Sequence, residues 1–177
     1  MVRVREMTEA DIEAVSAVRV RGWQFAYAGI VPQTYLDGMT IEDDARARRA
    51  RFTDSHERVL NLVAVDGDEG VVGWAALGPY RGNSAEPDAG ELYAIYLRPD
   101  VIGSGAGRTL IEAVHAEAVS RRFRTLLLWV LRDNARARRF YASAGYAPDG
   151  TVRGDRYEDV ELPALRYRVS LGQDDPI

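Results

Sequence analysis

Three glycines at alternate positions, Gly103, Gly105 and Gly107, occupy a segment that could hold a phosphate group. The apolar run 92–97 before it predicts a strand, and the apolar stripe after it predicts a helix. The first N–H groups of a helix have no partner inside the helix, and the helix dipole favours negative charge there. Glycine also lets the backbone approach a ligand closely, because it carries no Cβ. The order strand, glycine loop, helix therefore predicts a site for a phosphorylated cofactor.

The glycine spacing argues against two common nucleotide sites. A P-loop ends in Gly-Lys-Ser/Thr, and this chain contains no lysine. A dinucleotide fingerprint needs glycine at the position of Arg108, and its strand lies at the start of a repeated βαβ unit rather than in mid-chain. An ordinary strand-to-helix turn stays open as the simplest alternative.

A second stretch, 126–146, has the same strand-then-helix character. Its apolar run 126–130 predicts a buried strand, and Asp133-Asn134 is a typical helix start. Asn134 and Tyr141 lie seven residues apart, nearly two turns, so their side chains share one face of the predicted helix. Phe140 points about 100° away from Tyr141 and is expected in the core.

The second stretch resembles the second signature of the GNAT superfamily, the acyl-CoA-dependent N-acyltransferases, in the spacing Asn134-x-x-Ala137-x-x-Phe140-Tyr141-x-x-x-Gly145-Tyr146. The glycine loop resembles the first signature, a pyrophosphate loop, from Leu97-x-Pro99 to Gly105-x-Gly107. The two motifs occur in the family's order and at about its usual distance apart. The resemblance extends along the whole chain in the order of elements.

This resemblance implies acetyl-CoA as the cofactor. The residues that it implies for cofactor binding are Ile95, Tyr96, Leu97, Ile102, Gly103, Ser104, Gly105, Ala106, Gly107, Arg108, Asn134 and Tyr141. One position departs from the family, which usually has Arg or Gln where Ile102 stands. Because backbone N–H groups do most of the pyrophosphate binding, we expect weaker cofactor binding rather than none.

Acyl transfer from a thioester to an amine needs a neutral amine, and only about a thousandth of an alkylamine is neutral at pH 7. A general base is therefore useful, and contributes roughly 10²–10⁴-fold in rate. We predict Glu91 as the base, since it begins the central strand and projects to the same side as Tyr93. The resemblance implies Tyr141 as the general acid and a backbone N–H within 95–97 as the group that polarises the carbonyl. The other candidate carboxylates are Glu86, Asp88 and Glu158.

The segment 21–32 looks like an element of one GNAT subgroup, in the pattern W-Q-x-x-Y-x-G-I-x-P. In the family this region lines the acceptor side of the cleft. Trp23 and Tyr27 are four residues apart and share a helix face, and packing in the core is their alternative role. The predicted acceptor-binding residues are Trp23, Tyr27, Tyr93 and Trp129.

The composition limits the classes of function. With 177 residues, 46% hydrophobic and 28% charged, the chain is expected to form one domain over 1–177, with 172–177 as a frayed tail. The absence of cysteine excludes disulfides and a cysteinyl acyl intermediate. The net charge of −4 disfavours nucleic acid, and His56 and His115 are too isolated to suggest a metal site.

Nothing in the chain suggests a membrane. No stretch approaches the ~20 apolar residues of a membrane span, and the N-terminus alternates charge and valine, unlike a signal peptide. The expected location is therefore the cytoplasm.

The predicted elements are strands 2–5, 58–65, 71–77, 92–98, 124–131 and 160–169, and helices 8–27, 34–38, 40–52, 105–121 and 134–144. Their order matches the family. It implies an α/β (α+β) fold with a mixed, mostly antiparallel sheet, helices on both faces, and a V-shaped cleft between the fourth and fifth strands.

We therefore predict an N-acetyltransferase that acts on a primary amine of a small molecule or on an amino terminus. The alternative is a non-catalytic acyl-CoA-binding module with a degenerate GNAT fold, which Ile102 slightly favours. Tyr141, Asn134 and the intact glycines favour the enzyme. Dimers are common in the family, so a homodimer is a further expectation.

Overall fold

The computed structural model describes residues 1–52, 58–83 and 86–172, so His56 and most of the expected frayed tail lie outside the described residues. One seven-stranded sheet runs through the described chain in the order β1-β2-β3-β4-β5-β7-β6. Every pairing between neighbouring strands is antiparallel except β4 with β5. The strands are β1 (Val2–Glu6), β2 (Leu60–Asp66), β3 (Gly70–Pro79), β4 (Ala89–Leu97), β5 (Thr125–Leu131), β6 (Ala147–Tyr157) and β7 (Val160–Ser170).

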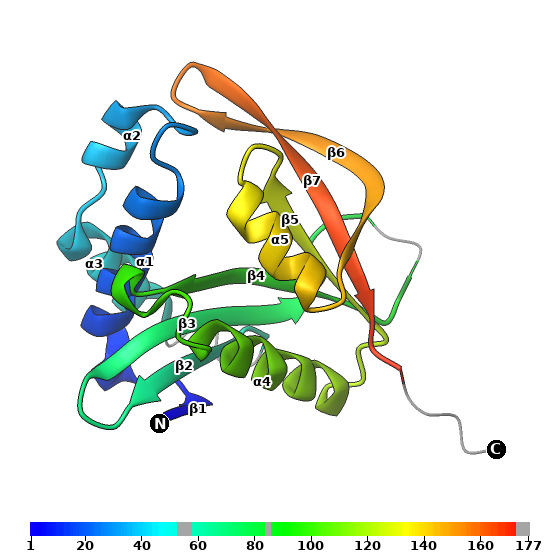
Figure 1. The fold of residues 1–177 in the computed structure, drawn as a ribbon, viewed down its shortest axis with the longest axis horizontal. Coiled ribbons are helices and arrows are strands. Elements are labelled where there is room, and N and C mark those ends of the chain that lie inside the picture. The colour runs from blue at the N-terminus through cyan, green and yellow to red at the C-terminus, as the bar shows by residue number, and fades with distance from the viewer. Residues whose placement is uncertain (53–57, 84–85, 173–177) are drawn as a thin grey trace.

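Helices cover both faces of the sheet (Figure 1). They are α1 (Ile12–Ala26), α2 (Gln33–Asp37), α3 (Ile41–Phe52), α4 (Ala106–Ser120) and α5 (Ala135–Ser143). One core lies under α4 and α5, and a second lies under α1 and α3 on the opposite face. The fold is therefore the mixed, mostly antiparallel α/β architecture that the sequence predicts.

The buried stripe of α4 matches the predicted one: Leu110, Ile111, Val114 and Ala118 are all buried. The start of α1 differs slightly from the prediction, because a short 3-10 turn, Glu9–Asp11, precedes the α-helix. Thr40 caps α3, since its Oγ1 accepts a hydrogen bond from the Asp43 N–H at 3.1 Å.

Strand β6 corrects the prediction, which leaves 147–157 without a strand. This segment contains Pro148, Gly150 and Gly154 and is mostly exposed, so it lacks the apolar alternation of a typical strand. The structure places it at the outer edge of the sheet, where it pairs with β7 alone and its register shifts between Pro148 and Val152. An edge strand tolerates such residues because one of its sides needs no partner.

The pairing between β4 and β5 is short. Registered pairs occur at Ala89–Thr125, Gly90–Leu126 and Glu91–Leu127. Beyond them the two strands diverge, as the directions of β4 and β5 in Figure 1 show. The second half of β4 therefore keeps one backbone edge without a neighbouring strand.

The junction between β1 and the first helical turn contains a buried carboxylate with a strong ion pair. The Arg5 guanidinium donates to both oxygens of Asp11, at 2.7 and 2.9 Å, and the Thr8 N–H donates to Oδ2 at 2.8 Å. These bonds, the one to Arg5 foremost, lower the pKa of Asp11 to about 2. Folding therefore gains stability from the ionised form.

We expect Asp11→Asn to lower the free energy of unfolding at pH 7 by roughly 2 kcal/mol, since a pKa unit corresponds to about 1.4 kcal/mol. The carboxylate's contribution is complete above its unfolded pKa, near 4, and is lost as the pH falls through its folded pKa near 2. The difference between variant and wild type should accordingly narrow between about pH 4 and pH 2. Urea unfolding at several pH values measures it.

Asp68→Asn is the matched control, because Asp68 lies in the β2–β3 turn and makes no ion pair with a described residue. Its unfolding free energy should follow that of the wild type throughout. A constant deficit for Asp11→Asn across the pH range would contradict the assigned ion pair.

Candidate active site

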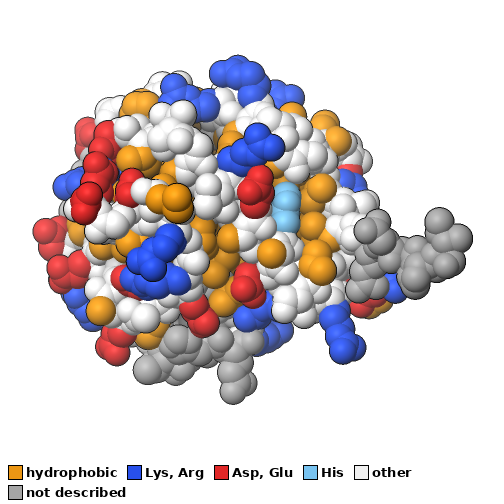
Figure 2. Space-filling view, turned by 60° about the horizontal axis from the view of Figure 1, so that its bottom comes forward, with side chains coloured by type: hydrophobic (Ala, Val, Ile, Leu, Met, Phe, Trp, Pro, Cys, Tyr) orange, Lys and Arg blue, Asp and Glu red, His pale blue; other side chains and the backbone are white. Residues whose placement is uncertain are grey.

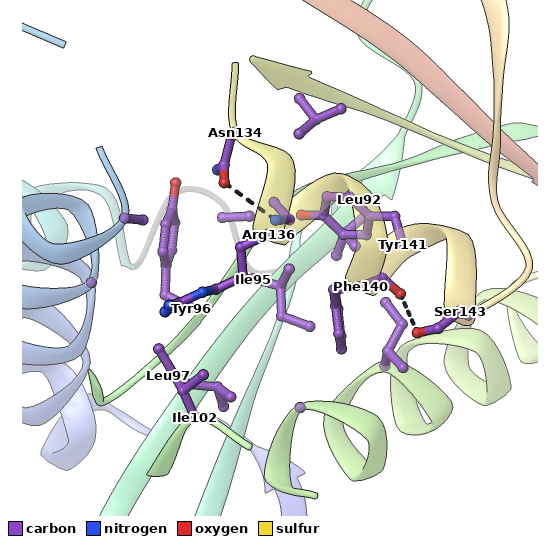
Figure 3. A pocket seen from close by; sticks show the side chains of 18 of the residues that line it. Leu92, Ile95, Tyr96, Leu97, Ile102, Asn134, Arg136, Phe140, Tyr141 and Ser143 are labelled. Carbon is purple, nitrogen blue, oxygen red and sulfur yellow. Dashed lines mark hydrogen bonds between the residues drawn. The ribbon is translucent and has the colours of Figure 1, made fainter. Parts of the chain in front are cut away.

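A cleft of about 810 Å³ opens where β4 and β5 diverge. Its walls come from the second half of β4, the loop 102–108, the start of α4, helix α5 and the end of α1. The volume falls within the range of about 300–1,000 Å³ that is typical of small-molecule and cofactor sites. Figure 3 shows Asn134, Phe140 and Tyr141 of α5 across from Ile95, Tyr96 and Leu97 of β4.

The glycine loop forms one end of this cleft. Gly103 and Gly105 have φ of 85° and 93°, a left-handed conformation that favours glycine, and open space surrounds the position of a Cβ at each. The N–H groups of Ile102 and Ser104 donate to Pro99 and Val101 inside the loop. Those of Gly103, Gly105, Gly107 and Arg108 donate to no acceptor within the described residues. Four backbone donors at the start of α4 are thus available to an anion.

The open edge of β4 supplies a second set of backbone groups. The Arg98 N–H donates to the Val72 carbonyl oxygen at 2.8 Å, which fixes the phase of the antiparallel ladder with β3. Because N–H directions alternate along a strand, the N–H of Tyr96 points toward β3, and the N–H groups of Ile95 and Leu97 face the cleft. These are the positions at which a carbonyl-polarising N–H is predicted.

Together these features fit a coenzyme A thioester. The free N–H groups of the loop suit a diphosphate, and the unpaired edge of β4 suits an extended chain that carries amides. The side chain of Ile102 is 40% exposed beside this loop, so the contact that Arg or Gln would make there is missing while the backbone donors remain.

Asn134 and Tyr141 both line the cleft from α5, as predicted. Asn134 is buried, and its Oδ1 caps the helix by accepting from the Ala137 N–H at 3.2 Å. Its Nδ2 donors are left for a ligand. The Tyr141 hydroxyl hydrogen-bonds to no described residue, and burial raises its pKa well above the ordinary value, so it stays protonated. Phe140 packs on the core and also lines the cleft.

The predicted acceptor residues have different environments. Tyr27 lines the cleft and its hydroxyl lies 3.1 Å from that of Tyr96, while Trp129 lines the cleft from β5. Trp23 lines neither pocket and packs edge-on against Tyr27, with ring centroids 4.6 Å apart. Trp23 therefore belongs to an aromatic cluster with Tyr27, Tyr35, Tyr96 and Tyr157.

Glu91 lies outside the lining of the cleft. It is 3% exposed, and Oε2 accepts from the Arg81 guanidinium at 2.6 Å while Oε1 accepts from the Arg81 N–H at 3.2 Å. Arg81 stacks over the Tyr93 ring at 4.0 Å. The other candidate carboxylates, Glu86, Asp88 and Glu158, line neither pocket. Arg81 follows β3 and lies outside every predicted helix and strand, so no pattern indicated its contact with Glu91.

A second pocket of about 1070 Å³ lies on the opposite face of the sheet, between β3–β4 and the helices α1 and α3. The cleft and the second pocket share two lining residues, Tyr93 and Ala94. At this point Leu92 pairs with Leu77 and Ala94 pairs with Ala76, so Tyr93 is an extra residue that forms a β-bulge. No pattern in the sequence indicates this bulge.

Within the described residues no group of three or more metal-ligating side chains could hold an ion.

None of the described helices is long and apolar enough to cross a membrane. Figure 2 shows hydrophobic side chains gathered through the middle of one face, with acidic and basic side chains mixed around them.

Comparison with known proteins gives a consistent family. Residues 23–146 match the Acetyltransferase (GNAT) family. The chain is 31% identical to an uncharacterized N-acetyltransferase, YuaI, of Bacillus subtilis (strain 168), over 99% of this chain and 94% of that protein. It is 23% identical to spermidine N(1)-acetyltransferase of Thermoplasma acidophilum, over 87% and 93% of the two chains.

Among solved structures, the fold is similar to that of the PaiA N-acetyltransferase of Thermoplasma acidophilum in complex with coenzyme A. The TM-score is 0.75 at 20% sequence identity, and the match covers 96% of this chain and 99% of the other.

We expect Gly105→Glu to abolish binding of coenzyme A, because a carboxylate would enter the space in front of the free N–H groups. Isothermal titration calorimetry with coenzyme A measures the loss. Gly70→Glu is the control, since Gly70 also has a positive φ, 73°, and open space at its Cβ, but lies in the β2–β3 turn away from both pockets. The control shares the backbone strain and should bind like the wild type. Binding by Gly105→Glu equal to that of the control would remove the loop from the cofactor site.

Proposed function

Because the chain belongs to the acetyltransferase (GNAT) family, we propose that it transfers an acetyl group directly to a primary amine of a small molecule or of an amino terminus. The chain is an acetyl-CoA-dependent acyltransferase. The observation that carries the proposal is the cleft, in which a protonated tyrosine hydroxyl, a row of free β4 N–H groups and an anion-binding loop face one space. The proposal treats 1–177 as a single catalytic domain, and a cytoplasmic location and a homodimer stay predictions.

Acetyl-CoA, when bound, supplies a thioester with an electrophilic carbonyl carbon and a sulfur that can leave. In the proposal the loop donors of Gly103, Gly105, Gly107 and Arg108 hold the diphosphate. Asn134 and the open edge of β4 orient the amide chain, and the flanking residues 95–97, 102, 104 and 106 shape this wall. A backbone N–H of β4 polarises the carbonyl as negative charge develops on its oxygen.

Tyr141 is the proposed general acid. Its hydroxyl lies in the cleft, is not tied to a described residue, and keeps its proton because burial raises its pKa. A neutral hydroxyl can donate a hydrogen bond, and then its proton, to a thiolate that leaves. The absence of cysteine from the whole chain supports direct transfer, without a cysteinyl intermediate.

Glu91 is the proposed base. Both of its carboxylate oxygens accept hydrogen bonds from Arg81, whose guanidinium stacks over the Tyr93 ring. Proton transfer from the amine to Glu91 then runs through water or requires Arg81 to move. Tyr27, Tyr93 and Trp129 remain the proposed acceptor contacts in the wall, and Trp23 supports them from the aromatic cluster.

A panel of primary amines, assayed by release of free coenzyme A thiol from acetyl-CoA, tests the function itself. We expect acetylated product, confirmed by mass spectrometry, for at least one amine. Coenzyme A binding without any acetylation of small amines or peptide amino termini would instead favour a binding module.

We expect Tyr141→Phe to lower kcat by about 10²-fold with little change in the dissociation constant of coenzyme A, because the hydroxyl acts on a thiolate that exists only late in the reaction. Steady-state kinetics with a saturating amine measures the first quantity and calorimetry the second. Tyr35→Phe is the control, since Tyr35 packs against Trp23 and lines neither pocket. Full activity of Tyr141→Phe would remove the assigned acid and leave the fold unaffected.

We expect Glu91→Gln to lower kcat/KM by about 10²-fold at pH 7 and to recover toward the wild-type value near pH 10, where the free amine no longer needs a base. The pH dependence of kcat/KM is the measurement. Arg81→Gln distinguishes two roles for Glu91, that of the general base and that of a group that only holds Arg81 in place. If Glu91 only holds Arg81 in place, both variants should show the same loss at every pH.

A further inference from the structure

The second pocket meets the cleft at the β4 bulge. Tyr93 and Ala94 line both spaces, and between them they form the only stretch of β4 that does so among the described residues. The floor of the second pocket includes Asn61 and Trp74 of β2 and β3, and its roof is formed by α1 and α3. A molecule in this pocket can therefore approach the inner end of the cleft from the face opposite α4 and α5.

The lining of the second pocket is rich in guanidinium groups. The described arginines that line it are Arg19, Arg48, Arg51, Arg58 and Arg81, and the described carboxylates that line it are Asp43 and Asp44. Asp44 is shared, because Oδ1 pairs with Arg19 at 2.7 Å and Oδ2 with Arg48 at 3.4 Å. Asp43 pairs with Arg46, which lies outside the pocket. Among the described residues that line these walls, arginines therefore outnumber carboxylates, five to two.

Arg48 carries a hydrogen-bond donor that the described residues do not satisfy. Its guanidinium stacks over the Trp74 ring at 4.4 Å, and its Nε is buried without an acceptor. Burial lowers the pKa of Arg48; the Asp44 carboxylate opposes this shift, and the charges of Arg19 and Arg51 add to it. A buried donor without an acceptor destabilises the site, so an anion at this position would stabilise it.

Two more arginines that line the pocket lie near Tyr93. Arg81 stacks on the Tyr93 ring, and Arg58 also acts electrostatically on Tyr93. Arg81 is balanced by Glu91, whereas Arg58 is exposed and forms no hydrogen bond or ion pair with a described residue. Cationic groups thus line the part of the pocket next to the bulge.

We propose that the acceptor extends from the cleft into the second pocket, and that it carries a carboxylate or similar anionic group in addition to its amine. The anion lies against Arg48 and Arg58, and the amine faces Tyr93 and Ala94 at the junction with the cleft. This inference rests on the proposed transfer to an amine. It narrows the acceptor to α-amino acids and to amino acids with a longer spacer between the amine and the carboxylate. A polyamine is the opposite case, since its ammonium groups would meet the guanidinium groups.

Matched pairs of amines that differ only in the anion test the proposal. The pairs are glycine and glycinamide, β-alanine and β-alaninamide, 4-aminobutanoate and 4-aminobutanamide, and 6-aminohexanoate and 6-aminohexanamide, with spermidine as the cationic comparison. Binding is measured by calorimetry on the full chain saturated with coenzyme A, and acetylation by thiol release, with kcat/KM calculated per neutral amine. For at least one spacer length, the acid should bind and react at least tenfold better than its amide, and better than spermidine.

Variants assign that preference to the pocket. Arg48→Gln and Arg58→Gln should each raise the dissociation constant and the KM of the preferred acid about tenfold, with a smaller change in kcat, and leave those of its amide nearly unchanged. Arg121→Gln is the control, because Arg121 is exposed at the end of α4 and lines neither pocket. Arg58 is exposed, so its variant gives an answer even if Arg48→Gln does not fold.

The binding and turnover measurements separate the two proposals. If acids bind selectively through Arg48 and Arg58 but no amine is acetylated, the pocket assignment stands and the transfer to an amine is wrong. If amines are acetylated but acids and amides bind and react equally, or spermidine is preferred, the anionic acceptor is overturned. Acid selectivity that persists unchanged in both arginine variants, or the absence of binding by every acid, also overturns it.

Discussion

The interrupted ladder between β4 and β5 is the constraint on which the site depends. A buried backbone N–H or C=O group needs a partner, and in the interior of a sheet the neighbouring strand normally supplies it. Here registered pairing ends at Glu91 and Leu127, while both strands continue for several residues. The cleft, the free N–H groups of Ile95 and Leu97 and the space that α5 lines all follow from that divergence. The glycine loop then places an anion-binding helix start at the end of the same opening.

The β-bulge at Tyr93 connects this opening to the opposite face of the sheet. An extra residue locally increases the twist of a strand and redirects its side chains. As a result Leu92 belongs to the core under α4, whereas Tyr93 and Ala94 both pack with the core under α1 and α3. Two chemically different spaces therefore share one short piece of backbone. The cleft offers neutral donors and aromatic groups, and the second pocket offers guanidinium groups.

The sequence predicted best what local spacing determines. Glycines at alternate positions before an apolar stripe predict the loop and α4, and the seven-residue separation of Asn134 and Tyr141 predicts that both face one space. The sequence missed β6, because an edge strand with Pro148 and Gly154 has no clear periodicity. It also missed the partner of Glu91. The contact with Arg81 depends on the path of the chain between β3 and β4, which no local pattern determines. Trp23 and Tyr27 share a helix face, but only packing decides which of the two reaches the cleft wall.

The short seam between β4 and β5 also has a mechanical meaning. It joins two parts of the sheet, β1 to β4 on one side and β5 to β7 on the other, at three residue pairs near one end. Pairing at one end alone opposes sliding of the two parts along each other. It opposes the separation of β4 from β5 at the other end only weakly, unless further contacts connect the two parts there. Phe25 of α1 and Arg136 of α5 make one such bridge, with the guanidinium 5.1 Å from the ring centroid. A ligand that lies along β4 and against α5 would add further contacts between the two parts. The rigidity of this fold therefore depends partly on the molecule that occupies the cleft.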